Sequence, residues 1–348
     1  MPVDLRRRNV PLASLTTLQL GGPAAELVEV STAEETVAAV RTADTAGTPL
    51  LLVGGGSNLV VADDGWPGVV VLLRSRGVEV SLDGDTVELR VAAGEPWDEL
   101  VARTVAEGWT GLECLSGIPG LAGATPVQNV GAYGQEVAET VRSVEVWDRE
   151  SGSIRELSTA DCVFGYRTSV FKHSDRYVVL SVRIGLRRSP RSGPVRYAEL
   201  ARHLDVEIGA DTDLTAVRDT VLMLRRGKGM VLDEADHDTW SAGSFFTNPV
   251  VDQSAFEARL DSGASYPHWP AEGGVKLSAA WLIDRAGFGR GYGSGRVGLS
   301  GKHTLALTNR GGASTTELIG LARTVRDGVA DRFGVRLQPE PRLVGVTV

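Results

Sequence analysis

Two glycine-rich segments of this 348-residue chain have the composition of backbone that binds a ligand. Residues 54–58 read Gly-Gly-Gly-Ser-Asn after a predicted strand, and consecutive N–H groups of such a turn can form an anion-binding nest. Residues 117–134 contain five glycines and two prolines but no charged residue. Because glycine lets another molecule approach the main chain, this run predicts a cradle for a large, flat ligand. The alternative for 54–58 is an ordinary tight turn, and the alternative for 117–134 is a buried irregular loop.

Neither segment matches a familiar nucleotide-binding motif. The strand-like run 59–62 follows 54–58, whereas a Rossmann loop opens a helix, and the Gly-Lys-Ser/Thr of a Walker loop is absent. The run 287–296 looks like a dinucleotide fingerprint, but it follows a predicted helix and no helix begins after it. We interpret it as a mobile loop that carries Arg290 and Arg296, either near an anionic ligand or merely exposed.

Three single side chains are candidates for acid–base or charge-stabilising chemistry. Arg167 is flanked by aromatic and apolar residues, and a partly buried guanidinium suits a carboxylate or phosphate, although a structural ion pair is the simpler explanation. Ser244 follows a glycine and precedes two phenylalanines, but the context is not a hydrolase elbow and a structural serine is the alternative. Glu340 stands between two prolines, so a stiff backbone could position its carboxylate as an acid or base.

The elements that must position these residues alternate between strands and helices. A strand at 25–30, a helix introduced by a Ser31–Glu34 capping box and a strand at 50–53 predict a βαβ unit. Later we expect helices at 97–107, 214–226, 279–286 and 317–333, and strands at 59–62, 69–73, 78–81, 87–92, 141–148, 154–158, 177–186, 305–308, 335–337 and 343–346. The acidic run 233–238 is a plausible domain boundary. The pattern predicts an α+β fold in at least two domains.

Composition excludes several classes of protein. The net charge of −8 argues against a nucleic-acid or membrane-surface binder, although a local basic cluster can still hold an anionic ligand. Cys114 and Cys162 lack metal-ligand spacing and fit a reducing compartment. The five histidines show no zinc-binding spacing, and we find neither a signal peptide nor a membrane span. A cytoplasmic protein without a metal is therefore expected.

Taken together and in this order, the segments resemble the UDP-N-acetylenolpyruvoylglucosamine reductases, which are bacterial flavoenzymes of peptidoglycan precursor synthesis. No single piece is decisive, but an accidental match of seven pieces in register is very improbable. The likeness covers nearly the whole chain, at 17–24, 54–58, 117–134, 166–167, 243–246, 280–284 and the region of Glu340.

The resemblance implies an α+β protein with a vanillyl-alcohol-oxidase (PCMH)-type FAD-binding domain in two subdomains and a C-terminal α+β substrate-binding domain. We expect subdomain 1 at 1–73, with 334–348 returning to it, subdomain 2 at 74–230, and the substrate domain at 231–333. Many oxidases of this fold tether FAD through a His or Cys, and the loop 117–134 has neither, so FAD would be bound non-covalently. The residues expected to bind it are Gly54, Gly55, Gly56, Ser57, Asn58, Leu59, Gly117, Ile118, Pro119, Gly120, Gly123, Ala124, Gln128, Asn129, Gly131, Ala132, Tyr133 and Gly134.

The family chemistry implies roles for the three single side chains. NADPH reduces the flavin, and flavin N5 then delivers hydride to C3 of the enolpyruvyl group of UDP-N-acetylglucosamine enolpyruvate. Arg167 matches the arginine that stabilises the substrate carboxylate, and Glu340 matches its partner, which must be protonated to donate. Ser244 matches the proton donor to C2.

Four further residues are carried over as substrate contacts: Tyr166, Tyr197, Asn248 and Lys276. The region of Tyr197 resembles a subgroup whose tyrosine-bearing loop closes over the substrate, and the length of that loop is open. Thr168 stands where the family often has Asp, which changes the surroundings of Arg167. We expect a monomer that binds UDP-N-acetylglucosamine enolpyruvate and NADPH. A sugar or alcohol oxidase of the same fold and a non-catalytic flavin- or nucleotide-sugar-binding protein are the rival interpretations.

Overall fold

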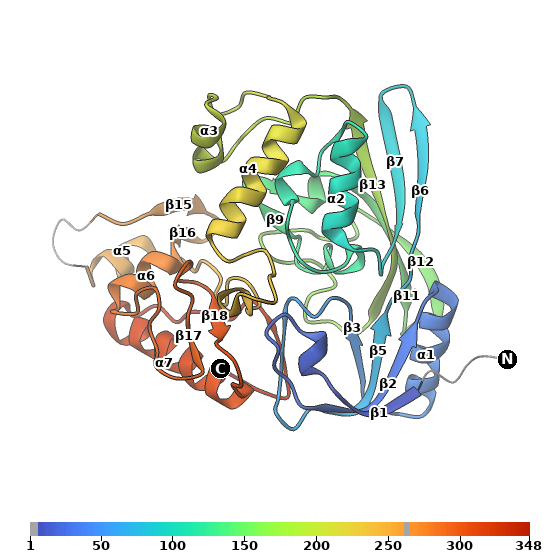
Figure 1. Cartoon of the computed structure of the whole chain (residues 1–348), viewed down its shortest axis with the longest axis horizontal. Coiled ribbons are helices and arrows are strands. Elements are labelled where there is room, and N and C mark those ends of the chain that lie inside the picture. The colour runs from blue at the N-terminus through green and yellow to red at the C-terminus, as the bar shows by residue number, and fades with distance from the viewer. Residues whose placement is uncertain (1–5, 261–264) are drawn as a thin grey trace. The chain divides into compact units, whose positions relative to one another are not determined.

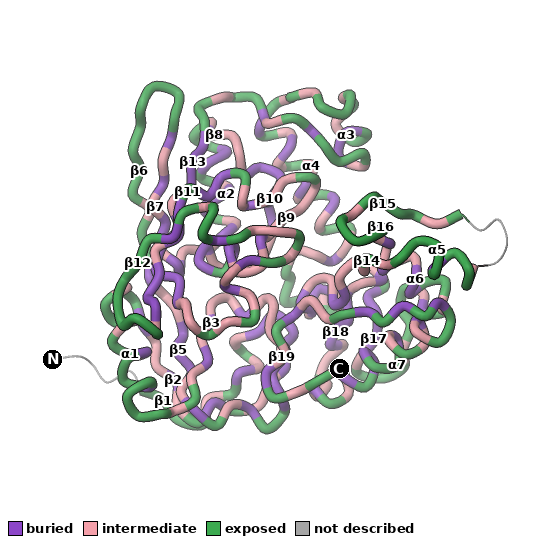
Figure 2. The backbone as a smooth tube through the Cα atoms, turned by 180° about the vertical axis from the view of Figure 1, so that it is seen from behind, coloured by how far each residue is buried: buried purple, intermediate pink, exposed green. Residues whose placement is uncertain are grey.

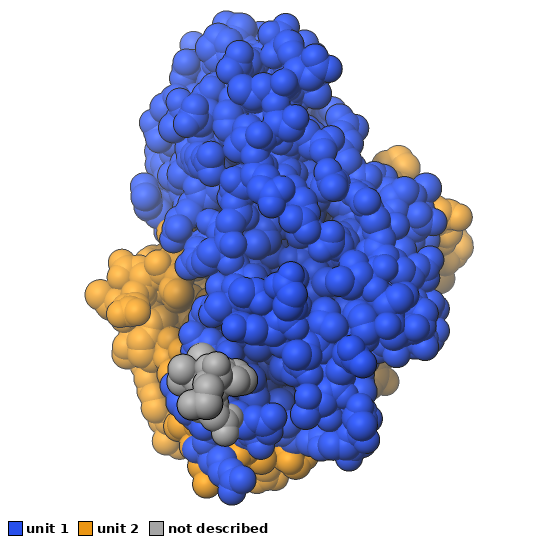
Figure 3. All heavy atoms as spheres, turned by 90° about the vertical axis from the view of Figure 1, so that its right-hand side faces the viewer, with its two compact units in different colours: residues 1–8, 26–55, 68–226 blue, residues 9–25, 56–67, 227–348 orange. Residues whose placement is uncertain are grey.

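The computed structural model of the protein describes residues 6–260 and 265–348. The chain forms two compact units, each made of segments that are distant in sequence (Figure 3). Unit 1 consists of residues 1–8, 26–55 and 68–226, and unit 2 of residues 9–25, 56–67 and 227–348. The predicted three-part division of the chain stays a prediction.

The main sheet of unit 1 has the strand order β12-β11-β13-β7-β6 (Figure 1). The short β8 (Trp109–Thr110) also pairs with β13. These strands are β6 (Val78–Asp83), β7 (Thr86–Ala92), β11 (Val141–Asp148), β12 (Ser153–Ser158) and β13 (Tyr177–Arg188). Helix α2 (Trp97–Ala106) packs Trp97, Leu100 and Val101 into the apolar core of this sheet. Most residues of β11 and β13 are buried, with Arg142, Arg187 and Arg188 exposed, whereas the free end of the β6–β7 hairpin is exposed (Figure 2).

A second sheet has the order β1-β2-β5-β3, formed by β1 (Arg6–Pro11), β2 (Pro23–Val30), β5 (Trp66–Leu73) and β3 (Leu50–Val53). Helix α1 (Ala33–Thr45) connects β2 to β3, which confirms the predicted helix between two strands. Its N-terminal cap lies one residue later than predicted, because the Thr32 side chain accepts from the Glu35 N–H. The Ser31 N–H donates to the Glu35 carboxylate at 2.7 Å.

Two helices follow β13 in unit 1. Helix α3 (Ala198–Leu204), which we did not predict, begins after Tyr197, and α4 (Leu214–Gly227) matches the predicted helix. Val195, Leu200, Val217 and Val221 pack together in a small apolar core with Cys114. The segment between β13 and α3 is therefore partly held by packing.

The core of unit 2 is built around α7 (Thr315–Phe333), which buries Leu318, Ala322, Val325 and Val329. A Ser314–Glu317 capping box begins this helix, and Gly334 ends it with φ of 66°. The unit also contains η5 (His237–Thr239), α5 (Gln253–Glu257), α6 (Ala279–Arg285) and the strands β4 (Leu59–Val61), β14 (Val250–Val251), β15 (His268–Ala271), β16 (Gly274–Leu277), β17 (Val297–Leu299), β18 (Leu307–Asn309) and β19 (Arg342–Val344).

One expected strand of unit 2 is wrong. Residues 335–337, all described by the structure, form no strand, although Val335 and Leu337 are buried in the core. The alternating pattern therefore reflects burial of an irregular segment. Strand β19, by contrast, pairs in parallel with β4. Over residues 6–260 and 265–348, none of the helices has the length and apolarity required to span a bilayer.

Candidate active site

The two predicted glycine-rich loops meet within unit 1. Gly54 and Gly55 directly follow β3, and a Cβ on Gly55 would lie 2.7 Å from the Cα of Gly120. This approach requires bare backbone, so a side chain at Gly55 would push the loops apart. The Gly120 carbonyl accepts from the Trp97 N–H at the start of α2. The turn and the long loop thus form one surface of uncharged main chain.

The middle of the long loop is anchored to the main sheet. Residues 122–124 form a 3-10 turn, and the Gly123 N–H donates to the Ala93 carbonyl at 2.9 Å. A Cβ on Gly123 would lie 2.5 Å from the Ala93 Cβ. At the loop entrance, the Gly117 N–H donates to Asp98 Oδ1 at 2.6 Å. The loop is therefore a fixed feature of unit 1.

Asn129 organises the end of the loop rather than presenting its amide outward. It is 1% exposed and left-handed, with φ of 46°. Its Nδ2 donates to Glu136 Oε2 at 2.7 Å and to the Gly165 carbonyl at 3.1 Å, and its Oδ1 accepts from Ala138. The bond to Gly165 links the long loop to the segment that carries Arg167.

Arg167 is held against this same loop. Its Nη2 donates to the Gly131 carbonyl at 2.8 Å, and its guanidinium carbon lies 5.8 Å from the centroid of the Tyr166 ring. The Arg167 backbone is left-handed, with φ of 53°, and its carbonyl accepts from Lys172 Nζ at 2.7 Å. A strained and doubly anchored arginine beside the long loop is a positioned cation.

Two tyrosines predicted for different roles are in contact. The rings of Tyr133 and Tyr197 meet edge to face with centroids 5.4 Å apart. Burial raises the pKa of Tyr133 to about 12, while Tyr197 is 43% exposed. Tyr197 immediately precedes the first residue of α3, so it lies at the N-terminal end of this helix.

Helix α4 supplies residues that sequence reasoning missed. Arg218 pairs with Asp98 at 2.7 Å, and Asp98 also binds the Gly117 N–H. Arg225, two turns further along the same face of α4, has its Nε shielded from solvent. Burial lowers the pKa of Arg225, and the charges of Tyr133 and Asp98 oppose this shift. Basic residues on an amphipathic helix gave no local sign of this link, in which Arg218 pairs with Asp98 and Asp98 binds the long loop at Gly117.

In unit 2, Ser244 and Glu340 are joined through the backbone. Ser244 forms a bridge with Ala306, and the next residue, Phe245, donates its N–H to the Leu305 carbonyl at 2.7 Å. The Phe245 carbonyl accepts from the Glu340 N–H at 2.9 Å. Phe245 is 1% exposed and anchors the segment in the core. Ser244 and Glu340 are thus positioned by one rigid framework.

The same framework continues to the start of β4. The Arg342 N–H donates to the Asn58 carbonyl at 2.9 Å, and Arg342 pairs with Leu59 in the β19–β4 ladder. Gly56 belongs to this part of the molecule, and a Cβ there would lie 1.8 Å from the Leu15 carbonyl oxygen. The predicted loop 54–58 therefore ends beside the Glu340 segment.

Asn248 and Lys276 lie on neighbouring elements of unit 2. Asn248 Oδ1 accepts from the Ala279 N–H at 2.9 Å, at the first residue of α6. Lys276 is half-buried in β16, opposite Val250 and Trp269. The side-chain oxygen of Asn248 accepts this hydrogen bond, so its side-chain amide nitrogen is the group that can donate to a ligand.

The run 287–296 is not simply exposed. The Arg310 guanidinium donates to the carbonyls of Gly291 and Gly293 at 2.9 and 2.8 Å, and Arg296 pairs with Glu317 at 2.9 Å. Arg310, which sequence reasoning missed, ties the loop to β18, which ends one residue earlier. Arg296 therefore has a protein partner, Glu317, in the first turn of α7.

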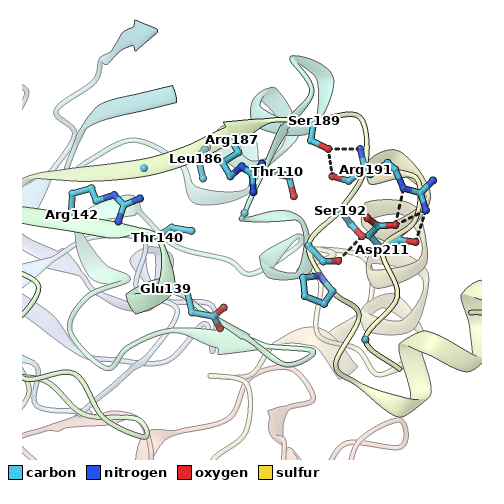
Figure 4. Close-up of a pocket in the computed structure, with 15 residues that line it drawn as sticks. Thr110, Glu139, Thr140, Arg142, Leu186, Arg187, Ser189, Arg191, Ser192 and Asp211 are labelled. Atoms are coloured by element: carbon cyan, nitrogen blue, oxygen red, sulfur yellow. Dashed lines mark hydrogen bonds and ion pairs between the residues drawn. The ribbon is translucent and has the colours of Figure 1, made fainter. Parts of the chain in front are cut away.

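A pocket of about 510 Å³ lies elsewhere in unit 1 (Figure 4). Arg142, Arg187 and Arg191 contribute to its lining, and the buried Glu113 holds its rim by accepting from Gly111 and Gly193. No predicted site residue lines it, although all of them lie in the described part of the chain. Within residues 6–260 and 265–348 no cluster of three or more His, Cys, Asp or Glu could hold a metal ion.

Comparison with known proteins identifies the class. The FAD binding domain family matches residues 24–158, where both glycine-rich loops lie. The family described as UDP-N-acetylenolpyruvoylglucosamine reductase, C-terminal domain, matches residues 234–344, where Ser244 and Glu340 lie. The chain is therefore an FAD-dependent oxidoreductase, and the predicted α+β fold with an FAD-binding domain is confirmed.

Full-length relatives define the family. UDP-N-acetylenolpyruvoylglucosamine reductase of Salinispora arenicola is 58% identical over 96% of this chain and 94% of its own length. The enzyme of the same name from Thermobifida fusca is 56% identical over 98% of both chains. The crystal structure of that reductase from Thermus caldophilus superimposes with a TM-score of 0.69 at 26% identity, covering 97% of this chain and 99% of that one. The chain belongs to the UDP-N-acetylenolpyruvoylglucosamine reductase family, as the resemblance indicated.

Proposed function

We propose that the protein reduces UDP-N-acetylglucosamine enolpyruvate to UDP-N-acetylmuramate, with NADPH as the reductant. The observation that carries this proposal is the shared framework of Ser244 and Glu340, in which Phe245 links a potential proton donor to a potential carboxyl donor. Family membership and the FAD-binding domain supply the redox half of the reaction.

The bare backbone of unit 1 fits an FAD cofactor. Gly55 and Gly120 approach too closely for any Cβ between them, and the long loop carries no charged side chain. Gly54, Gly55 and the loop from Gly117 to Gly134 would hold the cofactor through N–H groups and apolar contact. When bound, FAD accepts hydride from NADPH and supplies it to C3 of the enolpyruvyl group.

Arg167 and Glu340 would stabilise the charge that develops on the substrate carboxylate. Hydride addition at C3 leaves electron density at C2, which is delocalised into the adjacent carboxylate. Arg167 is already oriented by Gly131 and Lys172, so it pays little reorganisation cost when that charge appears. Glu340 would donate in its protonated form, which a neighbouring anionic substrate favours.

Ser244 would deliver the proton to C2. A serine hydroxyl is a weak acid, but a carbanion beside a carboxylate is strongly basic, so position decides whether transfer occurs. The bridge to Ala306 and the buried Phe245 provide that fixed position. The proton and the hydride together complete the two-electron reduction of the C=C bond.

We assign the UDP moiety to the remaining predicted contacts. Tyr197 lies against Tyr133 at the start of α3, in reach of solvent, as a residue that closes over a substrate requires. Asn248, Lys276 and Tyr166 would contact the diphosphate and the sugar. We also propose that the enzyme is monomeric and cytoplasmic. The proposal keeps the predicted domain boundaries at residues 73, 230 and 333. The pairing of β19 with β4 supports the return of 334–348 to the first subdomain.

An anaerobic two-step experiment tests the function. Oxidised protein is first bleached with one equivalent of NADPH while flavin absorbance is followed, and UDP-N-acetylglucosamine enolpyruvate is then added without oxygen. We expect rapid return of the flavin absorbance. Absence of reoxidation by this substrate, combined with rapid reoxidation by oxygen, would instead indicate an oxidase.

A further inference from the structure

His303 contacts the proposed proton donor from a different part of unit 2. The Nε2 atom of His303 lies 3.5 Å from Ser244 Oγ. Catalytic hydrogen bonds of this length are common before the substrate is bound and shorten in the reactive complex. The nearest sequence neighbours of His303 gave no indication of this contact.

The turn that carries His303 is built to hold the ring in place. Ser300 Oγ accepts from the His303 N–H at 3.1 Å and donates to Asp238 Oδ2 at 2.8 Å. The His303 carbonyl in turn accepts from the N–H of Ala306, the residue that bridges to Ser244. Both ends of the turn are therefore fixed, one to Asp238 and the other to the Ser244 strand.

A serine that protonates carbon needs its own proton replaced. Loss of the hydroxyl proton to C2 would leave an alkoxide, which is unfavourable in a site that also binds a carboxylate. A histidine is the side chain whose ordinary pKa, about 6.5, lets it hold and release a proton near neutral pH. The pairing of Ser with His is the arrangement that activates nucleophilic serines, here used in the opposite direction.

We propose that His303 is a positioning residue and proton relay that reprotonates Ser244 during reduction of the substrate; this rests on the proposed function. As hydride adds to C3, C2 bonds to the Ser244 hydroxyl hydrogen and the O–H bond breaks. The Nε2–H bond of the His303 imidazolium breaks and its proton passes to the Ser244 oxygen. His303 becomes neutral and recovers a proton from water. The only electron pair transferred is that of the hydride.

Several charged groups surround this turn. Lys302 pairs with Asp236, and this contact raises the pKa of Lys302 and lowers that of Asp236, so both stay charged near neutral pH. Asp238 binds Ser300, and Glu340 lies across the Phe245 backbone. Glu340 is therefore the competing source of a pH effect, and a Glu340→Gln profile must be recorded beside that of His303.

The test separates the two half-reactions of FAD-loaded protein by anaerobic stopped-flow between pH 5 and 9. We expect His303→Gln, whose amide nitrogen can replace Nε2 as a donor, to slow flavin reoxidation by substrate about 10²- to 10⁴-fold. The variant should also lack the decrease in reoxidation rate that we expect for wild-type protein above a pKa near that of histidine. NADPH reduction of the flavin should change less than twofold. The matched control is His268→Gln, an exposed histidine on β15, with wild-type behaviour in both steps.

Two outcomes would overturn the relay. His303→Gln could keep the wild-type rate and pH profile, or it could be slow while the basic limb persists and only Glu340→Gln removes it. A measurement on wild-type protein keeps the test valid if the variant misfolds. Reoxidation rates in H₂O/D₂O mixtures should depend non-linearly on the deuterium fraction, because two protons move. A linear dependence would contradict the relay. If wild-type protein fails to reoxidise at all, the proposed function fails instead.

Discussion

Substitution of Gly55 by alanine tests whether bare backbone shapes the cofactor surface. The new Cβ would lie 2.7 Å from the Cα of Gly120, whereas ordinary contact begins at 3.4 Å, so the loops must separate by about 0.7 Å. Overpacking of this kind typically costs about 1–3 kcal/mol. The FAD-free protein can relieve it by separating the loops, but FAD binding requires them close. The Kd for FAD should therefore rise about 5- to 150-fold.

The assay is a titration of FAD-stripped protein with FAD, monitored by quenching of flavin fluorescence. Gly54→Ala is the matched comparison, because the nearest atoms to its Cβ belong to the flexible side chain of Leu121, with Cδ1 closest at 3.3 Å. It should weaken binding less than Gly55→Ala does. Equal Kd values for wild type and Gly55→Ala, with a lower unfolding temperature for the FAD-free variant, would show that the loops matter for folding and do not bind FAD.

Three further predictions concern stability and local order. Arg176 donates to Asp148 and holds the pKa of that carboxyl well below its usual range, so the ion pair stabilises unit 1 above the unfolded pKa of about 3.9 and loses its effect as the pH falls. Asp148→Asn should therefore lower the melting temperature at pH 7. If the difference in melting temperature between wild type and variant were as large at pH 3 as at pH 7, this explanation would be refuted. Gly320 lies on the exposed side of α7, and a Cβ there would meet no atom within 4 Å. Gly320→Ala should therefore raise the free energy of unfolding by about 0.5–1 kcal/mol in a urea titration. A lower free energy of unfolding would contradict this prediction. Arg310→Ala should speed amide hydrogen exchange across 291–296, because the guanidinium no longer binds its carbonyls; unchanged exchange would mean that other contacts hold the loop.

Local patterns predicted the regular elements well where packing and capping agree. The stripe of apolar residues in 317–333 and Gly334 correspond to α7 and its C-terminal cap. The cap of α1 was displaced by one residue because Ser31 and Thr32 both suit an N-cap and are each followed three residues later by glutamate. Two adjacent solutions of similar energy cannot be separated by local rules.

The irregular parts required tertiary information. Alternation in 335–337 predicted a strand, but burial alone produces the same pattern, and the segment finds its partners in the unit 2 core. Asn129 was expected to contact the cofactor, whereas its side chain binds Glu136 and Gly165 and so positions the loop. Its left-handed backbone can still expose main-chain groups to a ligand.

The candidate site was accessible from sequence only through motifs. Ser244, Arg167 and Glu340 each have an ordinary structural explanation, and no spacing rule connects them. The contact of Ser244 with His303 depends on the bridge to Ala306, which brings together segments distant in sequence. Such pairings arise from the fold of unit 2, and local composition does not encode them.

The central claim is that Ser244 protonates C2 while hydride reaches C3. Its most direct test is anaerobic stopped-flow of Ser244→Ala, with flavin reduction by NADPH and reoxidation by UDP-N-acetylglucosamine enolpyruvate measured separately. The account predicts reduction close to the wild-type rate and reoxidation slowed by at least about 10²-fold. An equal loss in both half-reactions, or reoxidation at the wild-type rate, would contradict it.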